Sequence, residues 1–129
     1  MIGMVEMTER TFEMQDGEEF ALILQSLGMQ RSEAMIIAYL ANAGEATSRE
    51  IEVGTSLSQS EVSMKIRDLR GEKLIDERKG EIRGKGRPPA VYSLKTPLGE
   101  IIKRIEDEKQ REHALAMAKI RKLRGLALS

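Results

Sequence analysis

Five residues between positions 59 and 67 share one face of a predicted helix and carry side chains that could contact the edges of DNA bases. They are Gln59, Ser60, Ser63, Met64 and Arg67. Amide and hydroxyl groups hydrogen-bond to base edges, and an apolar side chain can contact the methyl group of thymine. A helix with small polar residues at its front end suits the major groove of DNA. The alternative interpretation is an ordinary helical hairpin with a solvated polar face.

A second group of polar residues lies in the segment RGKGRPP, residues 83–89. Arg83, Lys85 and Arg87 alternate with glycines there, and two prolines stiffen the exit. Glycine lets the backbone approach phosphates closely, and an arginine on such a loop fits the narrow, negative minor groove. A solvated turn is the alternative. The predicted DNA-contacting set is completed by three further residues, Thr47, Ser58 and Lys65.

The first element that must position these groups is a short helix beginning near residue 47. Thr47 or Ser48 can cap it, and its apolar side carries Ile51 and Val53. We expect Gly54 to end this helix, because glycine adopts the backbone conformation of a helix stop without strain.

The second element is the helix that would present the base-contacting residues. Ser58 and Glu61 have the spacing of a capping box, with serine at the N-cap and glutamate three residues later. Val62, Ile66 and Leu69 then recur at helical spacing and predict one buried stripe. The two short helices together predict a helix-turn-helix.

Upstream of this pair, residues 1–16 are Met-rich and acidic and are expected to form a loosely ordered tail. Gly17–Leu27 is predicted to be a helix. A second helix is expected over Glu33–Ala43, with Ser32 as its N-cap and Gly44 as its end.

Downstream, residues 74–79 and 90–95 are predicted to be two strands around the basic loop, which would form a wing. Thr96 and Pro97 provide a capping hydroxyl followed by proline, and predict a helix from Pro97 to about Leu123. The expected fold is mainly α with a small β-hairpin wing. Residues 17–95 would form a winged helix-turn-helix domain, and residues 96–129 a long C-terminal helix.

The long C-terminal helix carries a second block of apolar residues beyond a polar span, and this block would remain in water unless a partner covered it. A stripe near the N-terminus needs cover as well. A second copy of the chain is the simplest partner, so a homodimer is predicted. The expected interface residues are Phe20, Ile23, Leu24, Leu27, Leu115, Ile120 and Leu123.

The 129-residue chain has no net charge, but the charge is unevenly distributed. Residues 1–30 carry six acidic side chains and one basic, whereas residues 58–95 carry ten basic and six acidic. Basic charge therefore accompanies the predicted recognition helix and wing, where DNA phosphates would lie.

Composition argues against several other kinds of protein. The chain has no cysteine and a single histidine, His113, so no metal centre, cofactor or catalytic dyad is predicted. Aromatic residues make up only 3%, which disfavours base stacking as the main binding mode. The sequence has neither a long apolar run nor a signal pattern at its start, so a cytoplasmic protein without a membrane partner is expected.

Three segments resemble the winged helix-turn-helix transcriptional regulators of the MarR, ArsR and TrmB type, over about residues 27–95. They are LGMQRSEAMIIAYL, TSREIEVGTSLSQSEVSMKIRDLRGEKLI and GKGRPPAVYSLKTPLGE. The resemblance implies a dimeric DNA-binding repressor or activator, with the base-facing residues on the second helix and the three basic residues in the wing. Many relatives carry a basic residue where this chain has Met64. The effector domain of TrmB-like sugar sensors has no counterpart here, so the sequence shows no ligand sensor and leaves a small-molecule effector unknown.

Two alternatives to a DNA-binding regulator fit the sequence less well. A winged helix can serve as a protein–protein scaffold within a transcription or replication assembly, but a scaffold has no need of Arg83, Lys85 and Arg87. An enzyme is disfavoured, because the sequence has no nucleophile motif and no Gly-rich phosphate loop.

Overall fold

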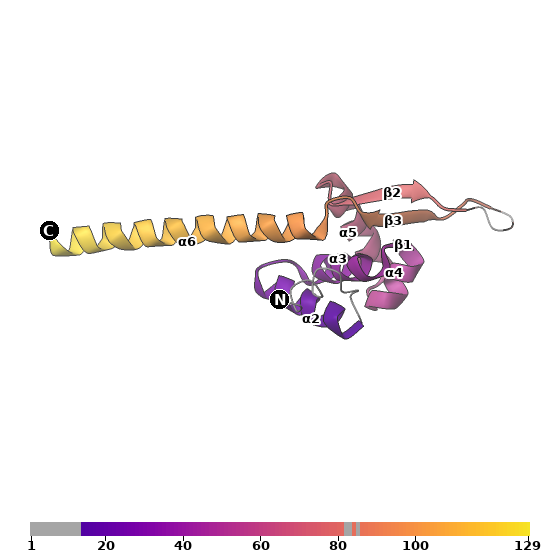
Figure 1. Ribbon diagram of the computed structural model, residues 1–129, viewed down its shortest axis with the longest axis horizontal. Coiled ribbons are helices and arrows are strands. Elements are labelled where there is room, and N and C mark those ends of the chain that lie inside the picture. Colours follow the sequence, from indigo (N-terminus) through magenta and orange to yellow (C-terminus); the bar gives the residue numbers. More distant parts are fainter. Residues whose placement is uncertain (1–13, 82–83, 85) are drawn as a thin grey trace, which may run out of the picture. The chain divides into compact units, whose positions relative to one another are not determined.

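The computed structural model describes residues 14–81, 84 and 86–129, and the chain divides into two compact units, Met1–Thr96 and Pro97–Ser129 (Figure 1). The elements of the first unit are α2 (Met14–Ser26), α3 (Arg31–Ala43), β1 (Glu45–Thr47), α4 (Ser48–Thr55), α5 (Gln59–Gly71), β2 (Ile75–Lys79) and β3 (Ala90–Leu94). The second unit is one helix, α6 (Leu98–Leu128). The predicted fold class is confirmed. α2 begins three residues before the expected helix start, and the rest of the predicted tail lies outside the described residues.

The core of the first unit is built around α3. Ile36, Ile37 and Leu40 are fully buried, because α2, α4, α5 and the sheet all pack against this helix. Gly44 ends α3 with a positive φ of 83°, as predicted. Ser32 is not its N-cap, because the helix already begins at Arg31 and its N-cap is Gln30.

The start of α6 also differs from the prediction. Its N-cap is Pro97, and the hydroxyl of Thr96 donates a hydrogen bond to the carbonyl oxygen of Lys73 at 2.9 Å. The buried Thr96 side chain therefore ties the end of β3 to the turn after α5. α6 continues to Leu128, so it is 31 residues long, or about 46 Å at 1.5 Å per residue.

The helix-turn-helix consists of α4 and α5, but α4 does not end at Gly54. It continues to Thr55, and Ser56 provides the left-handed turn with φ of 61°. The prediction that Val53 lies on the buried apolar side of this helix is also wrong, because its side chain is 69% exposed. Gly54 faces the ring of Tyr39 on α3, and a Cβ built at this glycine would lie 2.0 Å from Tyr39 Cε1. Gly54 therefore lets α4 approach α3 closely.

Gly54→Ala should destabilise the chain, although glycine to alanine within a helix normally stabilises by about 1 kcal/mol. The added methyl group would collide with the Tyr39 ring, and overpacking of this kind costs about 1–3 kcal/mol. Gly71→Ala is the matched control, because no atom outside its own neighbourhood lies within 4 Å of a Cβ there. Chemical unfolding should show opposite signs for the two variants. Equal stabilisation by both would contradict the packing role of Gly54.

α5 has the local structure that its sequence predicts. Ser58 is the N-cap, its hydroxyl accepts a hydrogen bond from the Glu61 backbone N–H at 3.2 Å, and the capping box is complete. Val62, Ile66 and Leu69 are at most 5% exposed and form the predicted buried stripe. One face of α5 is thus fixed against the core, which determines the face that remains outside.

The wing strands belong to a three-stranded antiparallel sheet in the order β1-β3-β2, rather than to an isolated hairpin. β2 and β3 run side by side in Figure 1, and β1 pairs with the other edge of β3. Arg78 on β2 reaches across β3 to Glu45 on β1, with Nη2 2.6 Å from the carboxylate. At the base of the wing loop, the Gly80 N–H donates to the Pro89 carbonyl oxygen at 2.7 Å.

Candidate nucleic-acid interface

The face of α5 opposite the buried stripe is exposed along its length. Ser60, Met64 and Arg67 lie on it, and Met64 is 56% exposed. Gln59 and Ser63 are exposed beside them. The structure therefore brings the five predicted base-contacting residues together on one open helix surface.

The hydroxyl groups of Thr47 and Ser58 serve as helix caps. The Thr47 hydroxyl accepts a hydrogen bond from the Glu50 backbone N–H at 3.2 Å, and the Glu50 carboxylate accepts one from the Thr47 N–H at 2.9 Å. Ser58 forms the equivalent box with Glu61. These two residues fix the N-termini of α4 and α5, and so determine how the exposed face of α5 is presented.

Lys65 lies on the flank of α5 next to α3, and its side chain is only 16% exposed. Its ammonium group donates a hydrogen bond to Gln30 and lies 3.9 Å from Glu33 and 3.7 Å from Asp68. Burial raises the pKa of Glu33, the negative charges of Glu72 and Asp68 raise it further, and Lys65 partly offsets these effects. Lys65 thus balances acidic groups of its own chain, which disfavours its predicted role in binding DNA.

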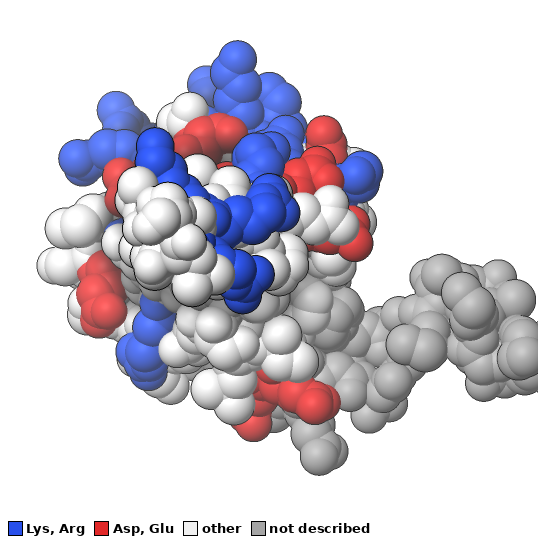
Figure 2. Space-filling model, turned by 90° about the vertical axis from the view of Figure 1, so that its left-hand side faces the viewer, with Lys and Arg blue, Asp and Glu red and all other residues white. Residues whose placement is uncertain are grey.

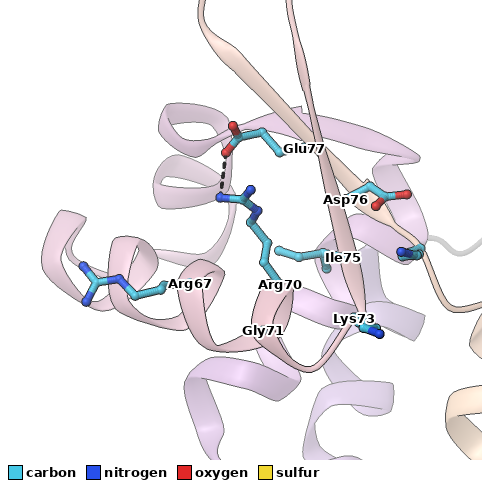
Figure 3. Close-up of a pocket in the computed structure, with 8 residues that line it drawn as sticks. Arg67, Arg70, Gly71, Lys73, Ile75, Asp76 and Glu77 are labelled. Atoms are coloured by element: carbon cyan, nitrogen blue, oxygen red, sulfur yellow. Dashed lines mark ion pairs between the residues drawn. The ribbon is translucent and has the colours of Figure 1, made fainter.

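The opposite flank of α5 faces the wing strands, where a shallow open pocket of about 460 Å³ lies between helix and sheet. In Figure 3, Arg70 extends toward β2 and Arg67 extends away from it. Arg70 Nη1 lies 3.2 Å from Glu77 Oε1. The sequence interpretation did not include Arg70 or Glu77. They are seven residues apart, on a helix and on the strand that follows it, so no local pattern signals their contact.

Part of the wing loop can be described. Arg87 is exposed, and Gly84 and Gly86 have φ values of 75° and 120°, in the region that favours glycine. The path of the loop therefore requires glycine at these two positions. Arg83 and Lys85 lie outside the described residues.

Charge on the surface is mixed. Figure 2 shows Lys and Arg side chains beside acidic ones over the face that it draws. Within the described ranges, no cluster of three His, Asp or Glu side chains could hold a metal ion, and no helix is both long and apolar enough to cross a membrane. His113 is exposed on α6.

Most of the predicted interface residues are exposed apolar side chains. Ile23 and Leu27 on α2 are 52% and 40% exposed, and the three predicted on α6 range from 44% to 66%. Phe20 is half-buried. Leu24 is 3% exposed within the chain itself, so its assignment to a dimer surface is wrong. The spacing could not separate it from its neighbours, because the apolar residues of α2 extend around more than one face.

Sequence comparison identifies the helix-turn-helix region. The model of the MarR family matches residues 27–85, from the end of α2 into the wing loop. The match covers less than half of the chain, so it shows similarity to the MarR family within this segment. No curated protein sequence matches the chain.

Solved structures share the winged-helix fold at low sequence identity. A possible transcriptional regulator from Methanosarcina mazei Go1 has a TM-score of 0.57 and 13% identity, and the match covers 86% of this chain and 88% of the other. A MarR family regulator from Neisseria meningitidis has a TM-score of 0.50 and 21% identity, over 84% and 83% of the two chains. A MarR family transcriptional regulator from Silicibacter pomeroyi DSS matches with a TM-score of 0.50 and 18% identity, over 76% and 63%. At these identities the likeness concerns the fold.

Proposed function

We propose that the chain is a sequence-specific transcriptional regulator that binds duplex DNA as a homodimer, without a catalytic role. α5 would enter the major groove, and the wing, residues 80–90, would contact the backbone and the minor groove. The observation that carries this proposal is the open face of α5, where Ser60, Met64 and Arg67 lie opposite a buried stripe. The family match over residues 27–85 and the regulators of like fold support it.

The proposed contacts divide into two kinds. Gln59, Ser60 and Ser63 offer hydrogen bonds to base edges, and Met64 offers an apolar contact to a thymine methyl group. Arg67 shares the base-facing surface of α5, and its charge would also bind a phosphate. The three basic residues of the wing would bind phosphates or the minor groove. The first kind of contact would select sequence, and the second would set overall affinity and position the protein.

The homodimer is proposed from two apolar surfaces. The α2 surface consists of Ile23 and Leu27 together with Leu22, which is 65% exposed. The α6 surface consists of Leu115, Ile120 and Leu123. Pairing α2 of one copy with α6 of the other would cover both surfaces, and a two-fold axis would set the recognition helices about 34 Å apart, one turn of DNA.

Charge favours this pairing over contact between two α6 ends. From His113 onward the sequence carries four basic residues and no acidic ones, so two such segments side by side would repel each other. Their basic residues are Lys119, Arg121, Lys122 and Arg124. The first turns of α2 instead present Glu18 and Glu19, both exposed. The opposite signs are those expected of complementary surfaces.

Single substitutions on α5 should test whether this helix selects sequence. Gln59→Ala or Ser63→Ala should relax the preference at particular base pairs by about 1–3 kcal/mol, because each removes a hydrogen-bonding group from the open face. Selection of bound fragments from the native genome would supply the operator, and titration of its single-base variants would measure the preference. Gln110→Ala, an exposed glutamine on α6, is the matched control. Equal weakening on the operator and on unrelated DNA would contradict a base-reading role.

A further inference from the structure

The last two turns of α5 carry two arginines with different surroundings. Arg67 makes no ion pair within the described part of the chain, and it extends away from the sheet (Figure 3). Arg70 is held by Glu77 of β2 at 3.2 Å. Arg70 follows Ser63 by seven residues, so the two lie on the same flank of α5. Arg70 thus lies beside the exposed groups that would contact DNA, but its guanidinium already forms an ion pair with Glu77.

The ion pair between Arg70 of α5 and Glu77 of β2 belongs to a larger contact that also includes Tyr92 of β3. Glu77 pairs directly with Tyr92 in the β2–β3 register. Burial raises the pKa of Tyr92, and a hydrogen bond from its hydroxyl to the Glu77 carboxylate raises it further. Glu77 therefore contacts both the tyrosine and the arginine, and its side chain remains 35% exposed.

We propose that Glu77 competes with DNA phosphate for Arg70, and so limits the affinity of the chain for DNA of any sequence. The inference rests on the proposed function. An ion pair between side chains as exposed as these, 49% for Arg70 and 35% for Glu77, is weak. A phosphate offers a guanidinium the same paired acceptor geometry as a carboxylate. Removal of the carboxylate should therefore release Arg70 for one additional phosphate contact per subunit.

The test compares Glu77→Gln, Arg70→Gln and the double variant with the parent chain, by titration of labelled duplex DNA at 50 to 200 mM salt. Glu77→Gln should bind more tightly, and its advantage should be about threefold larger at 50 mM than at 200 mM for each phosphate gained. Arg70→Gln alone should change the salt slope less than Glu77→Gln does, because Glu77 already competes for Arg70 in the parent. In the double variant the advantage should disappear, since the gain from Glu77→Gln requires the Arg70 guanidinium that this variant lacks.

Asp76→Asn is the matched control, because it removes one negative charge from the neighbouring position of β2 and has no ion pair among the described residues. An equal gain for Asp76→Asn would assign the effect to general charge and overturn the proposal. Weaker binding by Glu77→Gln would overturn it too, because Glu77 would then orient Arg70 toward DNA. A parent chain that binds no DNA at 50 mM would refute the proposed function, and the inference with it. A parent that binds and a Glu77→Gln variant with the same salt slope would refute the inference alone.

Discussion

The affinity of the dimer for duplex DNA should fall about 10⁴-fold when the salt concentration rises from 50 to 200 mM. The proposed phosphate-binding set contains Arg67, Arg83, Lys85 and Arg87, so two subunits of the proposed dimer would make about eight contacts. Each contact contributes about 0.9 to the slope of log K against log salt, because each releases a condensed counterion. Fluorescence anisotropy of labelled genomic fragments measures this slope. Salt-independent binding would refute the proposed function.

Loss of two wing arginines should halve this dependence. Arg83→Ala with Arg87→Ala removes about four of the eight contacts, so the same increase in salt should then cost about 10²-fold. Binding should weaken to a similar extent on all sequences, because the lost contacts are to the backbone and the minor groove.

Lys65→Gln is the control for the wing variant. It removes a basic residue from α5 itself, but one whose ammonium group is already bound to Gln30 and lies near Glu33 and Asp68. Its salt slope should equal that of the parent. If the wing double variant instead keeps the parent's slope, the wing does not contact DNA.

A chain that stops after Glu112 should be a monomer, and should lose about 10²- to 10⁴-fold in affinity for DNA with two half-sites. The deletion removes Leu115, Ile120 and Leu123, the proposed cover for α2 of the partner. Each monomer would then bind one half-site without the benefit of the second. Light scattering should give twice the mass of one chain for the intact protein and the mass of a single chain for the shortened one.

Substitutions separate loss of the apolar surface from loss of the helix end. Leu115→Gln, Ile120→Gln and Leu123→Gln together should reproduce the deletion. Ala114→Gln with Ala118→Gln is the matched control, because helical spacing puts these two residues on the opposite side of α6. A full-length chain that is monomeric at micromolar concentration would rule out the proposed dimer.

The sequence predicted those features that depend on residues close together in the chain. The capping box of Ser58 and Glu61 and the stripe from Val62 to Leu69 are short-range patterns, and they correctly locate α5 and its open face. Gly44 was identified for the same reason. Once the buried stripe of α5 is fixed, helical geometry alone assigns its outward residues.

The features that the sequence could not predict depend on partners far along the chain. Gly54 has the local pattern of a helix stop, and only the ring of Tyr39, fifteen residues earlier, reveals it as a packing contact. The charge of Lys65 fits phosphate binding until Glu33 is found beside it. β1 has only three residues, too few for an alternating pattern, and it forms because β3 offers it a free edge.

The attachment of β1 to β3 has a consequence for the order of folding. β2 and β3 are joined by a ten-residue loop, whereas 43 residues separate the paired Thr47 and Val91. The entropic free-energy cost of closing a loop grows as (3/2)RT times the logarithm of its length. Closing the longer segment therefore costs about 1.3 kcal/mol more than closing the hairpin loop. The hairpin should therefore form early, and β1 should join it only after the intervening helices have brought the two edges together. The sheet is thus completed late in folding, and its completion fixes the wing to the start of the helix-turn-helix.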